Sequence, residues 1–90
     1  MKTIVLDCDQ MTGREADHDY LARELSFPEW YGRNLDALYD FLTERAAGWR
    51  VVFTGCAGAE ERLPSYMRSL QRMCQDAEAE TPELYIAFLP

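Results

Sequence analysis

The stretch LYIAFL, residues 84–89, is the longest of three short, mainly apolar runs in this chain of 90 residues. The other two are TIVL, residues 3–6, and VVF, residues 51–53. Each run is continuous and does not alternate with polar residues, which is typical of strands buried on both faces of a parallel sheet. The sequence therefore predicts three such strands, one near each end of the chain and one in the middle.

Helical patterns fill the first interval between these strands. The sequence TGRE, residues 12–15, matches a capping box at the start of a helix, where Thr caps a backbone N–H and Glu reaches back. This first helix should place Tyr20, Leu21 and Leu25 on one face, together with Ala16, and should end before Phe27-Pro28. His18, the only histidine, lies among acidic residues, and we expect it on the surface.

A second helix should begin after Gly32, with Asn34 as its N-cap. Its apolar residues recur at helical spacing and should face the core: Leu35, Leu38, Phe41 and Leu42. Burying that stripe forces Asp36, Asp40 and Thr43 to point away from the core and leaves Tyr39 on the border between the two faces.

The second interval predicts a longer helix after Pro64, with an apolar side made of Tyr66, Met67, Leu70, Met73, Cys74 and Ala77. Acidic residues gather at its end, including Asp76 and Glu80. Residues 55–58 read as a loop, and residues 59–63 as a short turn of helix. With right-handed crossovers, this order predicts one small α/β domain, residues 1–90, of two or three layers.

The composition limits what the chain can do. Its 16 acidic residues against 9 Lys and Arg give a formal net charge of -7, which argues against nucleic acid and suits a basic partner. The N-terminus does not resemble a signal peptide, and no apolar run approaches the roughly 20 residues of a membrane span, so we expect a cytoplasmic protein. Cys8, Cys56 and Cys74 should be reduced thiols, two of them in the core. With a single His and scattered Cys, no nucleophile–base pair is readable, and we expect neither an enzyme nor a cofactor.

Asp36, Asp40 and Glu44 follow one another at four-residue steps, so like charges repel along one helix face at a cost of about 0.2–0.5 kcal/mol per pair. The acids could be a solvated face, ligands of a divalent metal, catalytic carboxylates of a glycosidase, or a surface that receives arginines from another protein. Trp30, Tyr31 and Tyr39 interleave with the acids, and aromatic residues beside charges favour the last of these.

The sequence FPEWYGRNLDALYDFLTE, residues 27–44, resembles the signature of the barstar family, intracellular inhibitors of barnase-type extracellular ribonucleases. The resemblance is strongest from Phe27 to Thr43 and extends more weakly over the whole chain. It implies a three-stranded parallel sheet packed by three or four helices, in a protein that is a monomer when free. It also implies that the acidic helix enters the ribonuclease active site and imitates RNA phosphates.

Carried over position by position, the resemblance assigns a partner-binding role to Trp30, Gly32, Asn34, Asp36, Tyr39, Asp40, Thr43, Asp76 and Glu80, with no catalytic residue and no metal. Asp40 would take the place of a substrate phosphate, and Trp30 would pack against the catalytic histidine of the enzyme. Arg33, Glu44 and Arg45 depart from the family pattern, which leaves the identity of the target open. A barstar-like module that binds a basic protein other than a nuclease is the alternative.

Overall fold

The computed structural model describes residues 2–10, 14–26 and 34–90, with the backbone alone for residues 14–17. Its elements follow the predicted order of strand, two helices, strand, one or two helices and strand, and the second interval contains two helices. The elements are β1 (Lys2–Asp7), the 3-10 helix η1 (Cys8–Gln10), α1 (Arg14–Glu24), α2 (Leu35–Arg45), β2 (Trp49–Thr54), α3 (Cys56–Arg62), α4 (Pro64–Glu80) and β3 (Tyr85–Phe88).

The three strands form one parallel sheet, as predicted, and the structure shows that their order in the sheet is β1-β2-β3. Val5 pairs with Val52, and Val52 pairs with Ala87, so these three side chains form a row across one face of the sheet. The neighbouring row on the opposite face contains Leu6 and Phe53, both of which are buried. The sheet therefore has one face turned to the core and one turned away from it.

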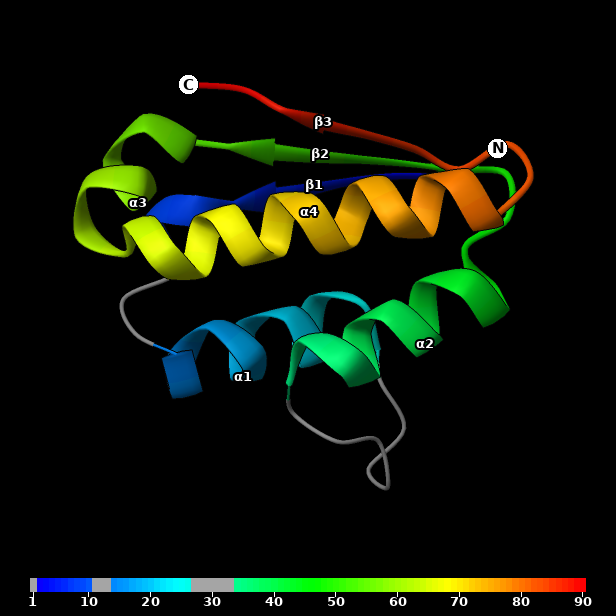
Figure 1. Ribbon diagram of the computed structural model, residues 1–90, viewed down its shortest axis with the longest axis horizontal. Helices are drawn as coiled ribbons and strands as arrows, with labels where there is room; N and C mark the ends of the chain where they lie inside the picture. The colour runs from blue at the N-terminus through cyan, green and yellow to red at the C-terminus, as the bar shows by residue number, and fades with distance from the viewer. Residues whose placement is uncertain (1, 11–13, 27–33) are drawn as a thin grey trace.

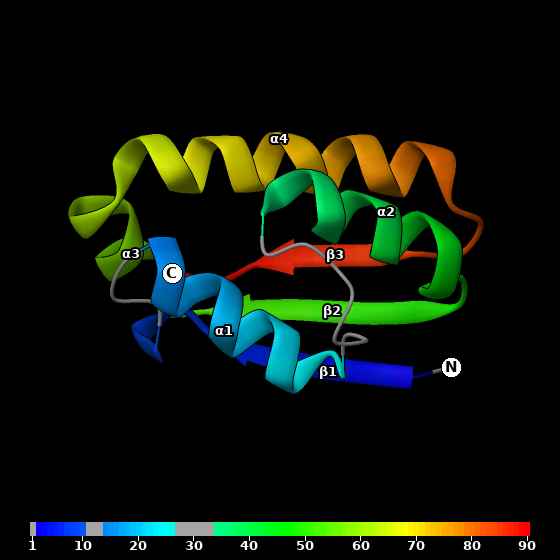
Figure 2. The same ribbon diagram turned by 90° about the horizontal axis from the view of Figure 1, so that it is seen from below.

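The prediction that the strands are buried on both faces is wrong. Helices α1, α2 and α4 lie on the same side of the sheet, and α3 lies at its end (Figures 1 and 2). On the other face Val5 is 60% exposed and Tyr85 is 54% exposed. The cause is the strand order, because each strand lies next to the one before it and always on the same side of it. Two crossovers of the same hand must then place their helices on the same face of the sheet. The result is a domain of two layers.

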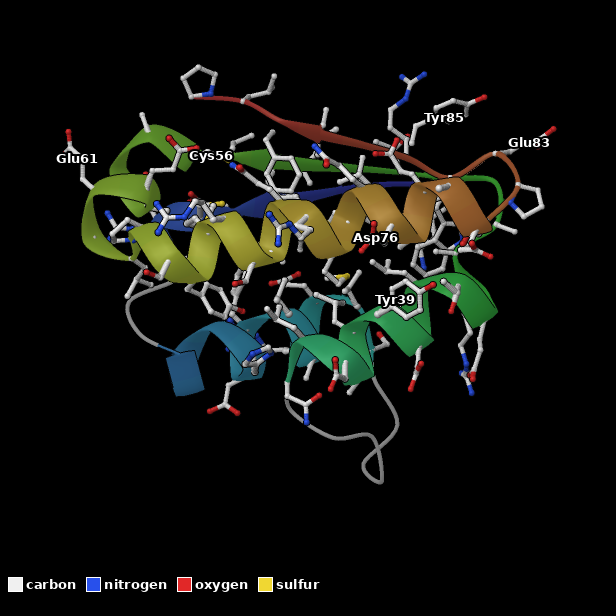
Figure 3. All side chains as sticks on the ribbon, in the orientation of Figure 1. Tyr39, Cys56, Glu61, Asp76, Glu83 and Tyr85 are labelled. Atoms are coloured by element: carbon white, nitrogen blue, oxygen red, sulfur yellow. The ribbon has the colours of Figure 1, made fainter. Side chains whose placement is uncertain are left out.

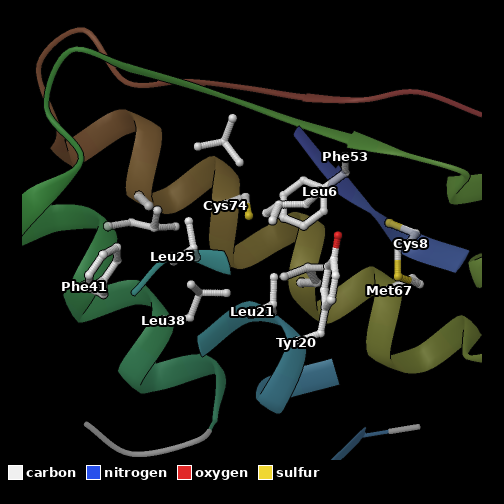
Figure 4. Packing of buried hydrophobic residues seen from close by; sticks show 14 of the residues in the cluster. Leu6, Cys8, Tyr20, Leu21, Leu25, Leu38, Phe41, Phe53, Met67 and Cys74 are labelled. Atoms are coloured by element: carbon white, nitrogen blue, oxygen red, sulfur yellow. The ribbon is translucent and has the colours of Figure 1, made fainter. Parts of the chain in front are cut away.

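The core lies between the sheet and the helices (Figure 4). Its largest fully buried side chains come from both layers: Leu6, Cys8, Leu21, Leu38, Val51, Phe53, Met67, Leu70 and Cys74. The predicted inner faces of the helices are confirmed, because Tyr20, Leu21 and Leu25 of α1 are buried, and so are most of the apolar residues named for α2 and α4. Leu35 and Met73 are partly buried and pack against the edge of this core.

Two local predictions need correction. His18 is buried, at 4% exposure, because it stands three and seven residues before Leu21 and Leu25 and so shares their helix face. The short helix α3 begins at Cys56, so residues 56–58 are helical and not a loop. Gly55, with φ at 68°, turns the chain into this helix, and the Cys56 N–H donates to the Leu89 carbonyl at 3.0 Å.

The three cysteines form no disulfide with one another, and all three are buried, whereas the sequence predicted two of them in the core. The sulfur atoms of Cys8 and Cys56 lie 3.6 Å apart, which places the start of η1 against the start of α3. Burial raises the pKa of the Cys74 thiol to about 12 and, together with the charge of Glu60, also raises the pKa of the Cys56 thiol. These thiols are therefore protonated packing residues at neutral pH.

Candidate functional site

The outer face of α2 follows from the way this helix begins and packs. The side chain of Asn34 accepts a hydrogen bond from the Ala37 N–H at 2.8 Å, which confirms it as the N-cap and fixes the first turn. With Leu38 and Leu42 buried against the core, Asp36 and Asp40 are exposed on the opposite side, as the leucine spacing predicted. The two carboxylates thus stand one helical turn apart in solvent.

The outer face of α4 carries the second pair of predicted acids. Met67, Leu70, Cys74 and Ala77 of this helix are buried, and Asp76 and Glu80 are exposed. Helices α2 and α4 lie next to each other and run in the same general direction (Figures 1 and 2). The acidic residues of both helices can therefore face one partner together.

A groove of about 600 Å³ runs along the seam between α2 and α4. Its α2 wall is made by Leu35, Asp36 and Tyr39, and its α4 wall by Ser65, Arg68, Ser69, Arg72, Met73 and Asp76. Figure 3 shows Tyr39 and Asp76 at this seam, one on each helix. The groove therefore brings together three of the residues named from the sequence, which come from parts of the chain about 40 residues apart.

The four carboxylates of this surface are available to a partner. Among the side chains of residues 2–10, 18–26 and 34–90, no cationic group lies within 4.0 Å of the carboxylates of Asp36, Asp40, Asp76 or Glu80. The ion pair between Arg62 and Asp9, at 4.0 Å, lies elsewhere in the molecule. None of the four carboxylates therefore forms an ion pair with a described side chain.

Three further residues named from the sequence have different surroundings. Tyr39 is half-buried at the edge of the core, as predicted for a border position. Thr43 is also half-buried, and its hydroxyl lies within 3.0 Å of the Tyr39 carbonyl and 3.2 Å of the Asp40 carbonyl, so it donates to its own helix. Asn34 is exposed, but its side-chain oxygen is occupied by the cap. Trp30, Gly32 and Arg33 lie outside the described residues.

The groove also contains residues that the sequence pattern alone did not single out. Arg68 and Arg72 are exposed on its α4 wall, beside Ser65 and Ser69. A signal was present in the sequence, because Arg68, Arg72, Asp76 and Glu80 follow one another at four-residue steps and so share one stripe of the helix. A smaller hollow of about 280 Å³ continues the groove past Ser65 and Ser69 toward His18 and Tyr66.

Two further features of the described residues bear on the nature of the site. No group of three or more His, Cys, Asp or Glu side chains in this part of the chain is placed to hold a metal ion. No helix among the described residues is long and apolar enough to cross a membrane.

Comparison with known families identifies the family of this chain. The family model of Barstar (barnase inhibitor) matches residues 1–89. The chain belongs to the barstar family. The three-stranded parallel sheet and the helix that carries Asp36 and Asp40 are thus those of a barstar, and the match covers nearly the whole chain.

A curated relative agrees with this assignment to the barstar family. The chain is 35% identical over 85 residues to the "Putative ribonuclease inhibitor YrdF" of Bacillus subtilis (strain 168). The matched region covers 89% of each of the two proteins, so the likeness extends over both chains and is not confined to the acidic helix.

Proposed function

We propose that this barstar-family protein is an inhibitor that binds a basic ribonuclease of the barnase type and blocks its active site. The observation that carries the proposal is the set of four exposed carboxylates, Asp36, Asp40, Asp76 and Glu80, on two adjacent helices with no internal cation partner among the described residues. The family match and the name of the Bacillus subtilis relative support a ribonuclease as the target.

The chemistry of the target explains the acidic surface. A ribonuclease active site concentrates arginine, lysine and histidine where RNA phosphates bind, and such a site attracts any rigid array of negative charge. Asp40 would take the place of a phosphate, with Asp36 beside it and Asp76 and Glu80 meeting further basic groups. Trp30, Gly32, Asn34, Tyr39 and Thr43 would complete the contact. The inhibitor itself supplies no catalytic group and needs no cofactor.

The repulsion along α2 is the cost of this arrangement in the free protein. Asp36 and Asp40 stand one turn apart, and the unfavourable interaction amounts to about 0.2–0.5 kcal/mol. Binding removes that repulsion, because each carboxylate gains a cationic neighbour. The same charges accelerate association by steering the two proteins together. We propose that the inhibitor acts in the cytoplasm, where it protects the cell from its own secreted ribonuclease or from a toxin of a competitor.

An RNA-cleavage assay tests the proposed function. Purified barnase and other secreted ribonucleases of its type would be titrated with the protein, and binding followed by calorimetry. We expect cleavage by at least one of them to stop at a one-to-one ratio. A pancreatic-type ribonuclease serves as a control for charge alone, because it is basic but differs in fold and should remain active. If the protein binds basic proteins without slowing RNA cleavage by any of the enzymes, the alternative of a general interaction module holds.

A further inference from the structure

The exposed stripe of α4 changes sign along its length. Arg68 and Arg72 occupy its first half, and Asp76 and Glu80 occupy the second half. All four side chains are exposed, and all four stand at successive four-residue steps. The α4 side of the surface proposed to meet a basic ribonuclease is therefore basic in its first half and acidic in its second half.

The two arginines are not explained by contacts with the described residues. The Arg68 guanidinium donates to the Ser65 hydroxyl at 3.4 Å, a neutral and exposed partner. Although Asp36 and Asp76 line the same groove, neither of them lies within 4.0 Å of a guanidinium nitrogen of Arg68 or Arg72 in the part of the chain that the structure describes. Neither arginine therefore forms an ion pair with a described side chain.

This arrangement conflicts with a partner that is basic throughout its contact surface. Like charges that face each other across an interface cost affinity and disfavour the complex. An inhibitor that met cations only would bind better without these arginines. Their place in the groove, beside Asp36 and Tyr39, suits a partner that presents a negative group at this point.

We infer that Arg68 and Arg72 form a subsite for a single carboxylate, an Asp or Glu side chain next to the active site of the target ribonuclease. A carboxylate can accept hydrogen bonds from two guanidinium groups at once, and the hydroxyls of Ser65 and Ser69 line the same wall as further donors. The subsite makes the inhibitor selective for those ribonucleases that carry an acidic residue at the matching position. This inference rests on the proposed function and specifies its partner.

The neighbouring acids explain why the occupant is one carboxylate and not a polyanion. Asp36 and Asp76 stand at the same groove, and Asp40 and Glu80 lie on the same two helices. A strand of RNA would place phosphates against these carboxylates as well as against the arginines, and the repulsion would offset the attraction. An acidic side chain surrounded by the arginines and lysines of a ribonuclease satisfies both halves of the surface.

Charge reversal tests the subsite, because a carboxylate occupant and a partner that is basic throughout predict opposite changes in the strength of inhibition. The double variant Arg68→Glu, Arg72→Glu and the neutral double variant Arg68→Gln, Arg72→Gln would be compared with the parent on a ribonuclease that the parent inhibits. If the partner is basic throughout, both variants should inhibit as well or better. If the subsite binds a carboxylate, we expect inhibition to weaken by about tenfold or more for the reversal and by less for the neutral variant.

Arg50→Glu is the matched control, because Arg50 is exposed on β2 opposite Tyr85, on the open face of the sheet and away from the groove. It changes the net charge in the same direction, and we expect inhibition to stay within about threefold of the parent, or to improve slightly. Thermal melting of every variant shows whether it is folded. The neutral variant avoids new repulsion with Asp76, so the test remains decisive even if the reversal unfolds the helix.

Replacing each acidic residue near the ribonuclease active site by its amide would then identify the occupant. One of these changes should weaken binding to the parent but not to the Arg68→Gln, Arg72→Gln variant. Inhibition by the reversal variant that equals or exceeds inhibition by the parent would overturn the subsite. That outcome would leave the proposed function intact, since the parent would still inhibit.

If the parent inhibits no ribonuclease, the proposed function fails, and the subsite is tested directly. Isotope-labelled protein would be titrated with N-acetylglutamate α-amide, whose only carboxylate is the one on its side chain. Saturable shifts of the Arg68 and Arg72 Nε resonances, absent from the neutral double variant, would support the subsite. Shifts that do not saturate, or that persist in that variant, would overturn it.

Discussion

The hydroxyl of Tyr66 on α4 lies 3.3 Å from Nε2 of His18 on α1, and the two rings meet edge to face with their centroids 5.6 Å apart. Both side chains are buried. The pair joins the first helix to the last one beside the hollow that continues the α2–α4 groove. It therefore helps to hold α4, with its arginines and acids, in place.

Tyr66→Phe should lower the free energy of unfolding by about 1 kcal/mol, because the ring contact stays while the buried hydrogen bond is lost. Urea unfolding followed by circular dichroism measures the difference. Tyr85→Phe is the control, since Tyr85 is 54% exposed on β3 and its hydroxyl makes no hydrogen bond with the described residues. Equal effects of the two changes would show that the His18–Tyr66 hydrogen bond contributes nothing to stability.

Asp40→Ala should separate stability from inhibition. The change removes repulsion from Asp36 and installs a better helix former at an exposed position, so we expect the same melting temperature or a slightly higher one. The free energy of binding to the ribonuclease should weaken by at least about 2 kcal/mol, because cations of the ribonuclease are then buried in the complex without their counter-charge. This magnitude is the one known for charge pairs in the complex of barnase with barstar, a member of the same family as this chain.

Glu61→Ala is the matched control for Asp40→Ala. Glu61 is an exposed acid on α3, far from the groove (Figure 3), and its replacement removes one negative charge from a helix in the same way. It should leave inhibition unchanged. If Asp40→Ala inhibits as well as Glu61→Ala does, the acidic face of α2 is not the contact surface. A strongly destabilised Asp40→Ala protein would contradict the exposed position of this residue.

Association with the ribonuclease should depend steeply on salt. From about 0.01 M to about 1 M ionic strength the Debye length shrinks from about 30 Å to about 3 Å, which removes long-range steering. Stopped-flow mixing should show an association rate constant that falls from about 10⁸ M⁻¹s⁻¹ or more toward about 10⁵–10⁶ M⁻¹s⁻¹, while dissociation changes less. The Asp36→Asn, Asp40→Asn variant should flatten this dependence, and Glu61→Gln should not. An association rate indifferent to salt would contradict electrostatic steering.

Stability should fall as the pH rises above about 9. In the folded chain burial raises the pKa of the Cys74 thiol from 9.0 to about 12, so this thiol stays protonated while the unfolded chain loses its proton. The unfolded state then binds fewer protons, and raising the pH favours unfolding, by at most about 1.4 kcal/mol per pH unit for one group. Urea unfolding between pH 8 and pH 11 should show a shallower decline for Cys74→Ala than for the parent. Parallel declines would mean that Cys74 ionises equally in both states.

The local pattern of the sequence predicted most of the elements and the direction of their side chains. Spacing alone placed Leu38 and Leu42 inside α2 and Asp36 and Asp40 outside, and it identified Asn34 as the N-cap. Such features depend on residues within one or two turns of each other, so they can be read along the chain. The acidic face and the order of strands and helices are therefore properties that the sequence by itself determines.

Only the tertiary structure decided which faces remained open and which residues met. The apolar runs did not reveal that one sheet face is exposed at Val5 and Tyr85, because this depends on the direction in which both crossovers step. The acidic residues next to His18 in the sequence predicted a surface position, whereas the folded chain buries His18 against Tyr66. The groove that unites Asp36 with Arg72 exists because α4 packs beside α2, and a contact between segments so distant in sequence is set by packing of the whole chain, not by local periodicity.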